Sequence, residues 1–135
     1  IKPQSEAGLL SRLIVAGYLR KQNQPGEATK LLEEMIGLSN EAIQASEATR
    51  SAYYLSNAFF WRGCARDEMG QTQLALADLK ESVKYNPDWG QPHLRLGYIY
   101  QKAGDLKSAV REFRASKMVD ETFIRQVESQ GKPPR

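Results

Sequence analysis

A pattern that recurs at a fixed offset constrains this chain of 135 residues more than any other feature. Three small residues recur 34 positions further along, as the pairs Gly63 and Gly97, Gly70 and Gly104, and Ala75 and Ala109. In each copy the first glycine lets a second helix approach, and the second suits the left-handed cap that ends a helix. The alanine stands where two helices would cross. The pattern therefore predicts an all-α chain of stacked helical hairpins.

Residues 56–89 and 90–123 hold the two clearest copies. The second of them carries the pattern residues Leu96, Gly97, Tyr100, Gly104, Ala109 and Phe113. Both copies resemble the tetratricopeptide repeat, a helix–turn–helix unit with a 34-residue period. The resemblance implies a three-repeat solenoid whose repeats hold other proteins and seldom do chemistry.

A weaker copy lies upstream and keeps the spacing at four positions, Ala16, Leu19, Ala28 and Leu32. Asn23 stands where the other copies have the glycine of the turn. Pro25 suits the first turn of a second helix, with Gln24 as its cap and Glu27 near the positive end of the helix dipole. We interpret this segment as repeat one.

The connection between repeats one and two is longer than a simple turn and has helical character. One apolar stripe at helical spacing continues through Leu32, Met35, Ile36 and Ile43. We therefore expect the second helix of repeat one to run to about Ala45. Ser46 then marks the start of the next helix, which would begin near Glu47. The result is an elongated hairpin between repeats one and two.

The chain has the size of a single domain, 1–135, and its apolar content of 41% is enough for a core. The predicted repeats are about 6–45, about 47–87 and 90–120. Phe123, Ile124 and Val127 have helical spacing and predict a C-terminal capping helix over 121–130. The last segment, 131–135, contains two prolines and two basic residues and predicts disorder.

The start of the chain and its hydropathy bear on its location. The first residue is Ile1 rather than methionine, so we expect a fragment excised from a longer protein. No apolar run approaches the roughly 20 residues that cross a bilayer, so we expect no membrane insertion by this fragment. We expect a soluble, reducing compartment, either the cytoplasm or the plastid stroma.

Residues that could do chemistry are few. The one histidine, His93, stands at a packing position of repeat three, and a structural role outweighs a catalytic one. Cys64 has no second cysteine, so no disulfide or thiolate zinc site can form within the chain. The adjacent acidic pairs, such as Glu33 and Glu34, diverge by about 100° on a helix. We therefore expect no enzyme, no catalytic residue, no metal and no cofactor.

The net charge of +3 raises the question of nucleic acid. The second helix of repeat three carries a basic face of Lys107, Arg111, Arg114 and Lys117. Such a face could bind phosphates in a salt-dependent way. It is interrupted by Asp105, Glu112 and Asp120, and exposed helix faces are usually charged. We interpret it as a solvated surface and expect no nucleic-acid partner.

In the tetratricopeptide family the first helix of each repeat lines a concave groove. The resemblance thus places eight candidate partner-binding residues there, Asn57, Phe60, Trp61, Cys64, Leu94, Arg95, Tyr98 and Gln101. Aromatic residues beside an arginine are typical of binding hot spots. The alternative is that Phe60 and Trp61 pack beneath the long helix of repeat one, and that Cys64 is a small apolar filler.

Some members of the family clamp the C-terminal carboxylate of Hsp70 and Hsp90 with lysine, asparagine and arginine side chains. Of those positions only Arg95 keeps a donor of this kind. The others hold Leu13, Gly17, Trp61 and Gln91. A terminal carboxylate would be left poorly paired here, which argues against a co-chaperone role.

Arg62 and Arg66 stand where the family usually buries leucine and tyrosine. A buried guanidinium needs a carboxylate partner. We expect Glu33, Glu34 or Glu41 on the lengthened helix to supply it. The alternative is that the aliphatic stems pack while the charged heads reach water.

Three functions fit these residues. The first is a non-catalytic adaptor that grips a helical or extended segment of another protein. The second is a regulatory subunit that restrains an enzyme, as in the plastid regulators of tetrapyrrole synthesis whose repeats hold glutamyl-tRNA reductase; this chain is similar in size and repeat count. The third is self-association into a homodimer through exposed edge helices.

Overall fold

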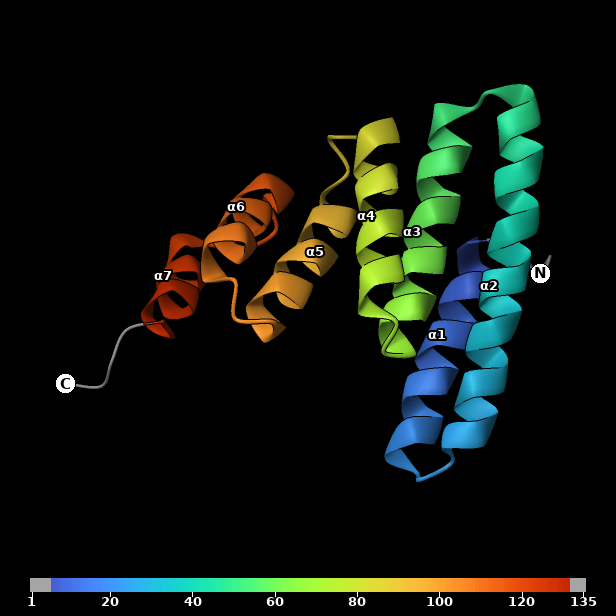
Figure 1. Ribbon diagram of the computed structural model, residues 1–135, viewed down its shortest axis with the longest axis horizontal. Helices are drawn as coiled ribbons and strands as arrows, with labels where there is room; N and C mark the ends of the chain where they lie inside the picture. The colour runs from blue at the N-terminus through green and yellow to red at the C-terminus, as the bar shows by residue number, and fades with distance from the viewer. Residues whose placement is uncertain (1–5, 132–135) are drawn as a thin grey trace. The chain divides into compact units, whose positions relative to one another are not determined.

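A computed structural model of the chain describes residues 6–131, with side chains described from Leu9 onward. This part of the chain forms α-helices joined by turns (Figure 1). The helices are α1 (Glu6–Lys21), α2 (Pro25–Thr49), α3 (Ala52–Glu68), α4 (Thr72–Tyr85), α5 (Gly90–Lys102), α6 (Leu106–Ser116) and α7 (Glu121–Ser129). The predicted all-α fold of successive helical hairpins is confirmed.

The chain divides into two compact units, residues 1–85 and 86–135. In the first unit α1 packs against α2, α2 against α3, and α3 against α4. In the second unit α5 packs against α6, and α6 against α7. None of the helices between residues 6 and 131 is both long enough and apolar enough to cross a membrane.

The turns inside the hairpins have the backbone geometry that their residues predict. Gly70 and Gly104 adopt φ angles of 77° and 84°, in the left-handed region, and Asn23 takes the same place in the first hairpin with φ 58°. Pro25 begins α2 and Glu27 lies in its first turn. Gln24 occupies the N-cap position, but its side chain makes no capping hydrogen bond, which corrects the cap predicted for it.

The boundary between α2 and α3 lies further along the chain than predicted. Helix α2 runs to Thr49 rather than to about Ala45, and α3 begins at Ala52 rather than near Glu47. Arg50 ends α2 in the left-handed region (φ 55°), and the hydroxyl of Ser51 accepts a hydrogen bond from the Tyr54 amide. Both Ser46 and Ser51 suit an N-cap, but Ser46 continues the buried side of α2, so Ser51 takes the role.

Helix α2 is consequently much longer than the helix it pairs with. It has 25 residues, whereas α1 has 16. At a rise of 1.5 Å per residue these are about 37 Å and 24 Å long. In Figure 1 the C-terminal part of α2 continues beside α3 past the start of α1. The predicted elongated hairpin is therefore present, and its extra length lies in α2.

Each unit has its own apolar core. In the first, Ile43 of α2 packs with Leu55 and Ala58 of α3, and Phe59 stacks on Tyr85 with ring centroids 6.0 Å apart. In the second, the fully buried Phe113 packs with Ala109 and with two residues of α7, Ile124 and Val127. Helix α7 thus covers the apolar side of α6. Of the segment predicted to be disordered, Gly131 lies beside Leu106, and residues 132–135 lie outside the described part.

Candidate partner-binding site

Four of the eight candidate residues lie on α3, and three of these are buried. Phe60 is 5% exposed and packs edge-to-face on Trp61, which is 6% exposed. Cys64 is fully buried. The expectation that Phe60 and Trp61 present open apolar surface is therefore wrong, because α3 turns this side toward its helical neighbours. The fourth residue, Asn57, is half-buried, and its side-chain amide donates to the Tyr53 carbonyl.

Asn57 and Trp61 line an open pocket in the first unit, with a volume of about 480 Å³. This lies within the ~300–1,000 Å³ range of ligand sites. The pocket is formed between the C-terminal part of α2 and the N-terminal part of α3, and Leu9 near the start of α1 also lines it. We refer to it as the α2–α3 pocket. Trp61 lines this pocket together with residues of α2.

The α2 wall of this pocket consists of small residues at helical spacing, namely Ala42, Ala45, Ser46 and Thr49. The α3 wall adds two tyrosines. Tyr53 and Tyr54 are 60% and 62% exposed and lie edge-to-face with centroids 5.4 Å apart. The described lining contains no charged side chain. The pocket is therefore suited to apolar groups rather than to ions.

Trp61 contributes one polar atom to this apolar surrounding. Its indole Nε1 is buried and has no hydrogen-bond partner among the described residues. A buried donor left unpaired costs about 1–3 kcal/mol.

The other four candidates lie on α5, in the second unit. Tyr98 is 48% exposed and lies edge-to-face against Phe113, with ring centroids 5.0 Å apart. Leu94 is partly buried against the core of that unit, and Arg95 is half-buried. The side-chain amide of Gln101 donates to the Gln130 side chain at the end of α7 (3.1 Å). Tyr98 is thus the candidate on α5 with the most open apolar surface.

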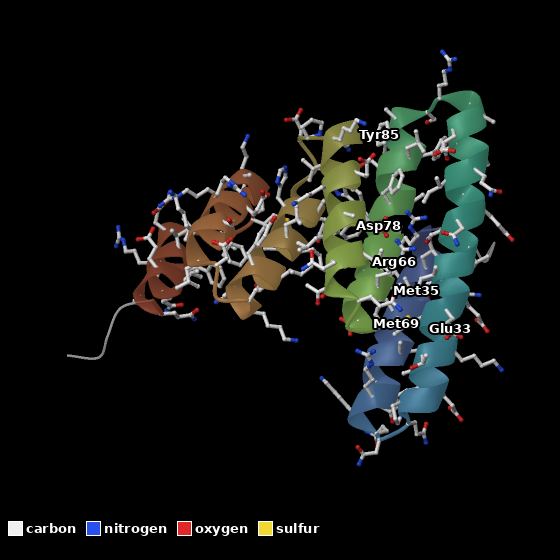
Figure 2. The ribbon with its side chains drawn as sticks, in the orientation of Figure 1. Glu33, Met35, Arg66, Met69, Asp78 and Tyr85 are labelled. Carbon is white, nitrogen blue, oxygen red and sulfur yellow. The ribbon has the colours of Figure 1, made fainter. Side chains whose placement is uncertain are left out.

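The two unusual arginines of α3 have a partner on α4 rather than on α2. Arg62 donates from Nε and Nη2 to the two carboxylate oxygens of Asp78, at 2.9 and 2.7 Å, and Arg66 donates from Nη1 at 2.9 Å. Arg62 also donates to Asn40 of α2. Figure 2 shows Arg66 and Asp78 directed toward one another. The predicted pairing with Glu33, Glu34 or Glu41 is wrong.

Asp78 was missed because acids inside an apolar stripe are easily taken for exposed residues. It follows Ala75 by three positions and precedes Leu79, both fully buried, and is itself 3% exposed. That placement on the buried side of α4 is the signal that could have identified it. Glu34 pairs instead with Arg12 of α1, with Nε and Oε2 3.6 Å apart.

His93 serves the packing of the second unit. Its Nε2 donates to the Pro87 carbonyl (2.9 Å), and its Nδ1 lies 2.7 Å from Oε2 of Glu112. Both ring nitrogens are thus engaged by neighbouring groups, as a structural histidine requires. The basic face of α6 is also partly neutralised, since Arg114 pairs with Glu121 and Glu128 of α7.

Two segments of the chain match a known family. Residues 57–88 match the tetratricopeptide repeat family, and residues 91–123 match it again. These two segments are tetratricopeptide repeats. Tetratricopeptide repeats are in general interaction modules rather than enzymes. The hairpin of α1 and α2, including the small-residue wall of the α2–α3 pocket, lies outside both matched segments.

One curated relative is the "Heat shock protein STI1" of Saccharomyces cerevisiae. It is 28% identical over 107 residues, which cover 79% of this chain. The chain spans only 17% of the length of the yeast protein. Neither comparison supports the narrower likeness to plastid regulators of tetrapyrrole synthesis.

Proposed function

We propose that this chain is a non-catalytic adaptor that binds a helical or extended segment of another protein. The observation that carries the proposal is the α2–α3 pocket, whose described lining is uncharged and includes two exposed tyrosines. Its tetratricopeptide repeats support a role in protein binding. Neighbouring exposed apolar residues of this size mark interaction sites more often than idle surface.

The tyrosines supply the binding energy in this proposal. Tyrosine has a large rigid ring and few rotatable bonds, so it loses little entropy when a partner covers it. Residues of this kind contribute about 2 kcal/mol or more each when they form the centre of an interface. Asn57 in the same pocket offers its side-chain oxygen to a partner's backbone.

The test compares the chain with a Tyr53→Ala, Tyr54→Ala double variant. Because both side chains project into solvent, the variant should keep its helical circular dichroism. Proteins retained from a lysate by the immobilised wild type are identified, and the affinity of each purified protein for both chains is measured by calorimetry. We expect a weakening of about tenfold or more in the double variant. Leu74→Ala, another exposed apolar residue of the first unit, is the matched control.

Failure to retain any protein, or equal affinity for both chains, would argue against the adaptor function at this site. If the wild type and the double variant bind with equal affinity but a Tyr98→Ala variant does not bind, the binding site lies in the second unit.

Binding of chaperone C-termini is a second candidate, favoured by the relative that is a heat shock protein. The residues argue against it, since Leu13, Gly17 and Gln91 offer no cationic donor and Trp61 is buried. The test of this candidate is to titrate C-terminal peptides of Hsp70 and Hsp90 into the wild type and into an Arg95→Ala variant. Binding that Arg95→Ala abolishes would establish the chaperone role, whereas we expect no binding to either chain.

A further inference from the structure

The hydrogen bonds of His93 in the second unit require one proton more than a neutral ring carries. The ring lies between two oxygen atoms, with Nε2 2.9 Å from the Pro87 carbonyl and Nδ1 2.7 Å from Oε2 of Glu112. A carbonyl and an ionised carboxylate can only accept hydrogen bonds, so each contact needs a proton on the ring nitrogen. A neutral imidazole has one such proton, and an imidazolium has two. We refer to these three groups as the His93 bridge.

The second proton belongs to the ring rather than to the carboxyl group. Histidine binds a proton more tightly than glutamic acid does. Glu112 also has the surroundings of an ionised carboxylate, since Nε of Arg111 lies 3.7 Å from its other oxygen. Asp88 and Arg95 flank the ring in the sequence, one before α5 and one within it. The geometry therefore corresponds to an imidazolium that donates from both nitrogens, with a charge-assisted hydrogen bond to Glu112.

The bridge holds the connection between α4 and α5 in place. Pro87 lies in this connection, and the N-cap residue of α5, Trp89, makes no side-chain capping hydrogen bond. The connection passes close to the end of α6, because a Cβ atom at Gly90 would collide with the Ser116 carbonyl oxygen. His93 is nearly buried, so its hydrogen bonds are largely shielded from water. Its ring thus joins the connection to both α5 and α6.

A neutral ring can keep only one of the two hydrogen bonds. The bond to Glu112 is the stronger, because its acceptor carries a charge. When the ring loses a proton to solvent, the remaining proton therefore stays on Nδ1. Nε2 then presents a lone pair to the lone pairs of the Pro87 carbonyl, and the two atoms repel each other. The bond that breaks is the one that holds the connection, whereas the bond between α5 and α6 remains.

We propose that the His93 bridge is a pH-sensitive switch that releases the connection between α4 and α5 as the pH rises. Histidine is the side chain whose charge ordinarily changes between about pH 5 and 8. The bridge is complete in the lower part of this interval and loses the Pro87 bond in the upper part. The two compact units meet in the chain after Tyr85, so the switch acts on the backbone that joins them. It does not depend on the α2–α3 pocket, which lies in the first unit.

The chain contains one histidine, so its ring signals in an NMR spectrum are unambiguous. The protonation of both ring nitrogens is followed across this pH interval in the full chain with isotope-labelled histidine. We expect a proton on each nitrogen at the lower end and a proton on Nδ1 alone at the upper end.

Hydrogen exchange measures the release of the connection over the same interval, after correction for the intrinsic effect of pH on exchange. The Trp89 amide donates to the Asn86 carbonyl within the connection, and its protection should fall about tenfold or more as the pH rises. The Gly104 amide, which donates to the Gln101 carbonyl in the turn after α5, is the internal control. Its protection should stay unchanged.

Glu112→Gln tests the proton count with little change in shape. A glutamine amide can donate to Nδ1, so a neutral ring that donates from Nε2 to Pro87 satisfies both partners. The variant should therefore protect the Trp89 amide equally at both ends of the pH interval. Glu128→Gln removes the same charge from α7, where it pairs with an arginine. This control should keep the pH dependence of the wild type.

The ring signals of the wild type decide the inference without any variant. A ring with a single proton across the whole interval overturns it, and so does a proton on Nε2 rather than Nδ1 at the upper end. Unchanged protection of the Trp89 amide in the wild type overturns the release of the connection. An equal fall in the wild type and in Glu112→Gln also overturns it, because the fall would then come from another group.

Discussion

Gly97 marks a close approach of α5 and α6 in the second unit. A Cβ atom at this position would lie 2.6 Å from two ring carbons of Phe113, and at Gly63 of α3 it would lie 3.0 Å from Leu79. Phe113 is fully buried and cannot move aside without disturbing the contacts around it. The recurring glycine of the 34-residue pattern is therefore a packing requirement, which is the role that the sequence predicted.

Replacing Gly97 by alanine should destabilise the chain by about 2 kcal/mol, in the range of overpacked cores. Gly37→Ala is the control, because nothing lies within 4 Å of a Cβ atom there and alanine is the better helix former. That variant should be stabilised by up to about 1 kcal/mol. Urea unfolding of the wild type and the two variants measures both changes in the free energy of unfolding. An unchanged free energy for Gly97→Ala would show that the Phe113 ring can shift to make room for the methyl group.

The candidate binding residues illustrate what the sequence could and could not predict. The resemblance to the family placed Trp61 and Cys64 on the groove side of α3, but their exposure depends on how the neighbouring helices pack on them. The pocket itself was missed, since its walls combine small residues such as Ala45 with Tyr53 and Tyr54 from the next helix. In the sequence, neither the small residues nor the tyrosines indicate a pocket, because the lengths of α1 and α2 are not known at that stage.

The helices differ most in how they end. Gly70 and Gly104 close α3 and α5 in the left-handed region without a Cβ atom, whereas Arg50 and Lys117 hold the same conformation after α2 and α6. A residue with a Cβ atom is strained there, by about 1 kcal/mol. The end of α2 was placed too early because its cap is an arginine, which sequence patterns do not associate with this geometry.

Arg50→Gly should therefore stabilise the chain by about 0.5–1 kcal/mol. Gly70→Ala is the reverse change at an equally open site, because its Cβ atom would meet nothing within 4 Å. It should cost about 1 kcal/mol through the backbone alone. Thermal unfolding measures the change in stability of both variants. Destabilisation by Arg50→Gly would show that the arginine head group makes a stabilising interaction.

Asp105 caps α6 and makes its stability depend on pH. The hydroxyl and the backbone amide of Ser108 hold the pKa of this carboxyl below its ordinary value of 3.8, and Arg111 and Lys107 add to the effect. Because the pKa is lowered in the folded state, the stabilisation is complete above the ordinary value. It is lost as the pH falls through the lowered one.

Asp105→Asn keeps a capping side chain but removes the titration. The difference in stability between wild type and variant should therefore shrink as the pH falls below 3.8. This difference is measured by unfolding both chains at a series of pH values, down to the lowest pH at which the wild type stays folded. A difference that stays constant with pH would mean that the charge of Asp105 has no part in the cap.

Across the first unit the helices are joined by polar contacts as well as by the apolar core. Asp78 of α4 binds both Arg62 and Arg66 of α3, and Arg62 reaches Asn40 of α2. Two buried serines add a reciprocal pair, since Ser56 Oγ donates to the Ser82 carbonyl and Ser82 Oγ to the Ser56 carbonyl, both at 2.8 Å. These contacts lie between neighbouring repeats as well as within one.

Asp78→Asn should lower the stability of the first unit by about 3 kcal/mol, because two partly buried guanidinium groups lose their counter-charge. Glu34→Gln removes a more exposed ion pair with Arg12 and should change stability by less than about 1 kcal/mol. Calorimetry of both variants measures the difference. Similar losses would show that the heads of Arg62 and Arg66 reach water and need no carboxylate.

The overhang of α2 past α1 has a consequence for local opening. The last turns of α2 have α3 as their neighbour, and they extend beyond the described part of α1, so their backbone amides should exchange with deuterium faster than those near Met35. Such a segment opens at a lower free energy than the unit around it. A partner that covers the α2–α3 pocket would raise that free energy, so its binding would be measured as slowed exchange between Ala42 and Thr49.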